Sequence, residues 1–138
     1  MKKILRSSRE GQFCGEHWRL TSSGINGVTL SGRENFDGWD DSSNTLAAMD
    51  KVLESALDEL PHAMVMDLSQ LKEISQLGHV HLTSVCRSLA EAGTRFAFVI
   101  HLELEPSLVY YQLHTLGHIA QDVDQALAWL HFTSYRAA

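Results

Sequence analysis

Short stretches near the start of the chain alternate between apolar and polar residues and are bounded by turn residues. Residues 17–21 alternate in this way, and residues 28–32 form a second stretch of strand character. Asn26-Gly27 lies between them, and an Asn-Gly pair favours the tight turn of a β-hairpin. The pattern therefore predicts a hairpin, and residues 1–15 before it are expected to form an arm or an edge strand.

Helical spacing replaces this alternation after a polar stretch at 37–44 that is rich in helix-capping residues. The apolar residues are then spaced by three and four, as on one stripe of an amphipathic helix. This stripe consists of Leu46, Met49, Leu53, Leu57 and Leu60. Pro61 is expected to end the helix.

Two runs, 63–66 and 96–100, are apolar at successive positions, which favours strands buried on both faces. Between them, a helix is expected from about residue 76 to 92, with Gly93 after its end. After them, a helix from Pro106 to Gly117 with Leu108, Tyr111 and Leu116 facing inward, a strand at 119–121 and a last helix after Asp122 or Asp124 are expected.

The predicted order is β-β-α-β-α-β-α-β-α. An opening hairpin followed by alternating units predicts an α/β fold with a mixed sheet that is largely parallel after the first strand. Because the helices are short, we expect them to lie mainly on one side of the sheet. With 138 residues, the chain is expected to hold one domain at 16–138, preceded by the segment 1–15.

Charge and composition exclude several classes of protein. A net charge of −6 argues against a nucleic-acid partner, because such affinity depends on Lys and Arg at the phosphates. No apolar run reaches the roughly 20 residues of a membrane span, and no apolar segment of a signal peptide follows the basic start. Cys14 and Cys86 form no CxxC pattern, which favours a reducing compartment. The sequence therefore predicts a cytoplasmic protein.

A set of short motifs, in their order and spacing, resembles the STAS domain, the module of bacterial anti-sigma factor antagonists and of sulfate-transporter tails. The resemblance runs from about His17 to Leu130. It is carried by Val28–Gly32, Asp67-Leu68-Ser69, Gly78, Ala92-Gly93, Leu116-Gly117 and Asp124–Leu127. It implies a STAS-like fold and a regulatory module that binds another protein, either an anti-sigma factor or switch kinase or a transporter subunit.

The chain departs from this family at the residue that acts as the switch. In signalling members, a loop after the Asp-Leu-Ser strand reads Asp-Ser-Ser-Gly, and its first serine is phosphorylated. A gapless register from Asp67 to Gly78 places Ser75 at the aspartate position and Gln76 at the acceptor position. Gln76 cannot accept phosphate, so we expect no switch at the usual position. Ser75 is the acceptor only if the register slips by one residue.

The resemblance implies a partner surface formed by the loop at 73–78 and the solvent face of the following helix. Its expected residues are Glu73, Ser75, Gln76, Gly78, His79, Thr83 and Arg87. The protein is then either always able to bind or bound to an unrelated partner. An alternative is a small-ligand sensor that holds a nucleotide or a lipid on the same fold. Whether the protein is a homodimer stays open.

Candidate metal ligands and nucleophiles form no recognisable motif. His79 and His81 point about 200° apart on a helix and cannot share an ion there. No HExxH or CxxC pattern is present, so no metal or other cofactor is expected. Cys14 has Glu16 and His17 nearby but no third orienting group. A non-catalytic protein is the interpretation that we favour.

Overall fold

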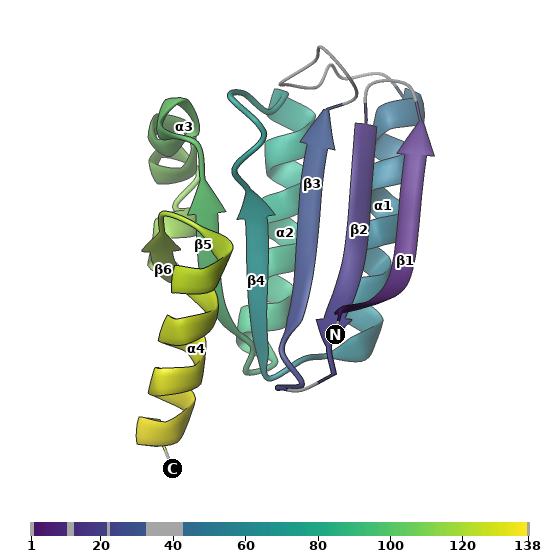
Figure 1. Cartoon of the computed structure of the whole chain (residues 1–138). Coiled ribbons are helices and arrows are strands. Elements are labelled where there is room, and N and C mark those ends of the chain that lie inside the picture. The colour runs from purple at the N-terminus through teal and green to yellow at the C-terminus, as the bar shows by residue number, and fades with distance from the viewer. Residues whose placement is uncertain (1, 11–12, 22, 33–42, 138) are drawn as a thin grey trace.

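The protein contains a mixed β-sheet in the computed structural model, which describes residues 2–10, 13–21, 23–32 and 43–137. These residues form a six-stranded sheet in which the strands follow one another in chain order (Figure 1). The strands are β1 (Lys2–Glu10), β2 (Phe13–Leu20), β3 (Asn26–Gly32), β4 (Ala63–Leu68), β5 (Arg95–Ile100) and β6 (Gly117–Ala120). The first three are antiparallel, and β3 to β6 are parallel.

Helices cover both faces of this sheet, unequally. They are α1 (Ser43–Glu59), α2 (Gln76–Glu91), α3 (Glu105–Tyr110) and α4 (Val123–Ala137), with short 3₁₀ helices η1 (Leu102–Leu104) and η2 (Leu113–Thr115). The larger core joins α1 and α2 to one face and takes in Leu108 of α3. A smaller core joins α4 to the opposite face through Val65, Val99 and Leu130 (Figure 1). The predicted mixed α/β fold is confirmed, with α4 as the helix on the second side.

The hairpin turn lies a few residues before the predicted position. Asn26 and Gly27 belong to β3, where they pair with Arg19 and Trp18 of β2. The turn is instead closed by hydrogen bonds between Leu20 and residues 24 and 25. The Trp18 ring occupies the space that a Cβ on Gly27 would need, and its Nε1 donates to Thr29 Oγ1 at 2.9 Å. The glycine of the Asn-Gly pair is therefore required by the close approach of the Trp18 ring to the backbone, and not by a turn.

The strand β1 lies at the edge of the sheet and pairs only with β2. Its side chains are mostly exposed, and four of them are Lys or Arg. The boundary expected at residue 15 falls inside β2. The start of a helix was expected within 37–44: residues 37–42 lie outside the described residues, and α1 begins at Ser43.

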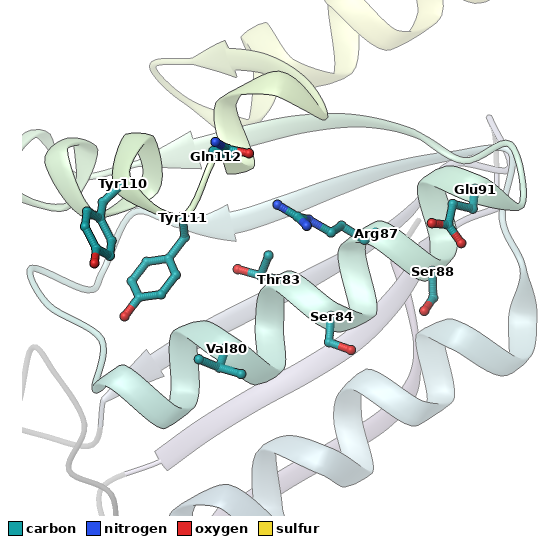
Figure 2. Close-up of a pocket in the computed structure, with 9 residues that line it drawn as sticks. All are labelled: Val80, Thr83, Ser84, Arg87, Ser88, Glu91, Tyr110, Tyr111 and Gln112. Carbon is teal, nitrogen blue, oxygen red and sulfur yellow. The ribbon is translucent and has the colours of Figure 1, made fainter.

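The helix expected from Pro106 to Gly117 is much shorter in the structure. It ends at Tyr110, and Gln112 then takes a left-handed conformation, with φ 63°. Gly117 begins β6 instead of ending a helix. Only glycine fits there, because a Cβ would collide with the backbone carbonyl of Phe96 in β5. The broken helix leaves Tyr110, Tyr111 and Gln112 next to α2 (Figure 2).

Candidate interaction surface on helix α2

The loop between β4 and α2 is held by buried anchors and a helix cap. Leu71 is fully buried and Ile74 is 8% exposed. Ser75 is the N-cap of α2: its Oγ accepts a hydrogen bond from the backbone N–H of Gly78 at 3.2 Å. Its carbonyl accepts from the N–H of His79 at 2.9 Å. Ser75 therefore satisfies N–H groups that the first turn would otherwise leave unpaired.

The residues of the expected partner surface divide into two groups in the structure. Glu73, Gln76 and Arg87 are exposed, while Ser75 and Thr83 are half-buried. Gly78 and His79 are buried. The expectation that His79 lies on the solvent face is therefore wrong.

The burial of His79 follows from helical spacing. On α2 the buried residues are Gly78, His79, Leu82, Val85, Cys86 and Leu89. His79 lies three residues before Leu82, on the same stripe, because residues three and four apart share a helix face. Its ring stacks on Tyr111, with centroids 4.6 Å apart and planes 13° apart. Burial lowers the pKa of His79 to about 4, so the ring is neutral at pH 7.

The face of α2 that points to solvent carries exposed apolar side chains. Leu77 is 51% exposed and Val80 is 52% exposed. Leu77 therefore lies outside the buried stripe of α2. His81 is half-buried, and its Nε2 contacts the Asp50 carboxylate of α1.

Grooves lie on both sides of this exposed ridge. The larger, of about 540 Å³, lies between α2 and the end of α3 with the two residues that follow it (Figure 2). It is lined by Val80, Thr83, Ser84, Arg87, Ser88, Glu91, Tyr110, Tyr111 and Gln112. The other, of about 380 Å³, lies between α1 and α2 and is lined by Leu46, Asp50, Leu77, Val80, His81 and Ser84. We call Leu77, Val80 and Ser84 with the two grooves the α2 surface.

The candidate catalytic grouping near Cys14 is not brought together. His17 is fully buried and bonded to Ser55 and Asn26, whereas Glu16 is paired with Lys2 at the surface. Adjacent strand residues point to opposite faces, which separates His17 from Glu16. Within the described residues, no three His, Cys, Asp or Glu side chains gather as a metal site, and no helix is long and apolar enough to cross a membrane.

Comparison with known proteins supports the fold. No protein-family model and no curated protein matches the sequence. Among solved structures, an anti-sigma factor antagonist from Mycobacterium paratuberculosis matches with a TM-score of 0.60 and 17% sequence identity. The match covers 95% of this chain and 95% of that chain. The chain therefore has the STAS fold of an anti-sigma factor antagonist, as the sequence resemblance implied.

Proposed function

We propose that the protein is a non-catalytic regulatory module that binds a partner protein through the α2 surface. The observation that supports this function best is the exposure of Leu77 and Val80 on a helix flanked by two grooves. Exposed apolar groups gathered at a groove are characteristic of interaction sites. The fold and the sequence resemblance favour an anti-sigma factor, a switch kinase or a transporter subunit as the partner.

The β4–α2 loop supports a module without a phosphorylation switch at the family position. Gln76 is the first residue of α2, is exposed, and has no hydroxyl that could accept phosphate. Ser75 has a hydroxyl, but this group caps the helix. We therefore expect a protein that binds its partner without prior dephosphorylation.

The test is affinity capture from a lysate of the source cell with matched bait proteins. Val80→Asp places a charge on the α2 surface, and Ala128→Asp places the same charge on the exposed side of α4. We expect wild type and Ala128→Asp to retain one common partner, and Val80→Asp to lose it. Capture of that partner by all three baits would contradict the proposed surface.

Intact-mass analysis of the recovered bait tests the missing switch. We expect the unmodified mass. A phosphate mapped to Ser75 would show that this serine is the acceptor. A bound small molecule without a protein partner would instead favour the ligand-sensor alternative.

A further inference from the structure

The larger groove of the α2 surface is lined by an arginine, Arg87, that makes no ion pair with the described residues. Arg87 is exposed, and its side chain makes no ion pair or hydrogen bond with the described residues. It extends over the groove toward Tyr111 and Gln112, away from Glu91 one turn later (Figure 2). An arginine four residues before a glutamate often pairs with it on a helix. Here the guanidinium remains available to another group.

A buried hydroxyl without a partner lies in the same groove. Thr83 precedes Arg87 by one turn, and its Oγ1 is inaccessible to solvent and accepts or donates no hydrogen bond among the described residues. Both ring nitrogens of His79, one turn earlier, are also buried and have no hydrogen-bond partner in the described part of the chain. Buried polar atoms normally find partners, so each exception asks for an explanation. These exceptions gather on the side of α2 that faces α3.

The residues around this pair have the character of a protein contact. Tyr110 is 79% exposed, and its ring meets that of Tyr111 edge to face, with centroids 5.0 Å apart. Tyrosine and arginine are enriched where protein interfaces carry most of their binding energy. The groove is bordered on its other side by the exposed Val80. A partner segment would thus meet a cation, two phenol rings and an apolar edge.

We propose that the groove between α2 and α3 receives an Asp or Glu side chain of the partner protein, flanked by an apolar residue that covers Val80. The carboxylate would accept hydrogen bonds from the Arg87 guanidinium, which is exposed at the groove. Charge-assisted bonds of this kind are stronger than bonds between neutral groups. The inference rests on the proposed function, because it assigns the chemistry of a partner that binds the α2 surface.

The experiment is a selection of random 12-residue peptides displayed on phage, with the immobilised full chain as target. We expect the selected peptides to share an acidic residue next to an apolar one. Synthetic copies are then titrated against variants by fluorescence anisotropy. Arg87→Glu should weaken binding at least about tenfold. Arg9→Glu, an equal charge change on the exposed edge strand, should leave affinity unchanged.

Exchanging the charges of the peptide and of position 87 gives the most specific test of the contact. A peptide whose acidic residue is replaced by Arg should bind Arg87→Glu better than it binds the wild type, whereas a merely structural role of Arg87 would give no such rescue. Peptides without a shared acidic residue, affinities indifferent to Arg87→Glu, or failure to select any peptide would each overturn the inference.

Val80→Asp separates this failure from failure of the proposed function. If Val80→Asp abolishes peptide binding while Arg87→Glu does not, the α2 surface stands and the carboxylate contact is wrong. If neither substitution affects binding, the peptide lies elsewhere and both proposals are wrong.

Discussion

Two buried histidines belong to regions of opposite character. His17 is fully buried between β2, β3 and α1. Its Nε2 accepts a hydrogen bond from Asn26 Nδ2 at 3.1 Å, so Nδ1 carries the proton and donates to Ser55 Oγ at 2.8 Å. His79 is 2% exposed, and neither ring nitrogen has a partner among the described residues. Its ring stacks on that of Tyr111.

The comparison distinguishes a region in which the buried histidine has all its hydrogen bonds from one in which buried polar groups have none within the described residues. Asn26 also accepts from Arg19 Nε at 3.4 Å, and Arg19 is paired with Glu59, so the bonds of His17 continue to the surface without a gap. Around His79, the neighbouring Thr83 is unpaired as well. A complete network fixes one arrangement of the elements that it joins, whereas buried groups without hydrogen-bond partners fix none.

The largest expected effect is the unequal cost of the same substitution at the two histidines. His17→Phe leaves the Asn26 amide and the Ser55 hydroxyl without their partner and should lower the free energy of unfolding by about 3 kcal/mol. His79→Phe removes no hydrogen bond and retains a ring against Tyr111, so its effect should stay within about 1 kcal/mol. Urea denaturation at pH 7.5 measures both. Equal losses would contradict the distinction.

The next effect is a loss of stability in acid that both histidines share. Burial lowers the pKa of His79 to about 4, and burial with the nearby Arg19 lowers that of His17 to about 4, from 6.5. Between pH 6.5 and 4 the unfolded chain therefore binds more protons, and stability falls as the pH falls. The contribution of the two neutral histidines to stability is complete above pH 6.5 and is lost as the pH falls toward 4.

Replacing one histidine isolates its contribution to the pH dependence of the unfolding free energy. The decrease in unfolding free energy from pH 7.5 to 5.0 should be about 2 kcal/mol smaller in His79→Phe than in the wild type. Denaturation curves at the two pH values provide the measurement. An unchanged decrease would mean that His79 is protonated with no penalty in the folded protein.

The sheet and most elements were predictable because they depend on local spacing and on burial. The apolar runs at 63–66 and 96–100 correspond to β4 and β5, and the expected helix at 76–92 corresponds to α2. The groove was not predictable, because it depends on the end of α3 at Tyr110 and on the left-handed Gln112. No glycine or proline marks that break. The burial of His79 was accessible from its three-residue spacing to Leu82, but its polarity favoured the opposite assignment.

A smaller contrast is expected between two buried threonine hydroxyls. Thr94 Oγ1 donates to the carbonyl of Pro61 at 2.5 Å, and Thr94→Val should lower the unfolding free energy by about 1–2 kcal/mol. Thr83→Val removes an unpaired hydroxyl and should leave stability equal or up to about 1 kcal/mol higher. Thermal and urea denaturation compare the two. A stability loss at Thr83 as large as at Thr94 would show that its hydroxyl is satisfied in the folded chain.

The smallest expected effect is a difference in reactivity between the two thiols. Burial raises the pKa of Cys86 to about 12 on the inner side of α2, whereas Cys14 on β2 is half-buried. Because the thiolate is the reactive form, Cys14 should react with iodoacetamide at pH 8 and Cys86 only after unfolding. Peptide mapping after timed alkylation shows the order. Early labelling of Cys86 would indicate that the α2–sheet contact opens readily.

The position of α4 has a consequence for biosynthesis. Val65, Ala97, Val99 and Ala120 form an apolar face that α4 covers through Ala126 and Leu130. The ribosome synthesises this helix after all the strands that it covers, so the apolar face of the nascent sheet stays exposed until α4 has left the ribosome. Chains stalled at that stage are the species most prone to associate with one another or with a chaperone.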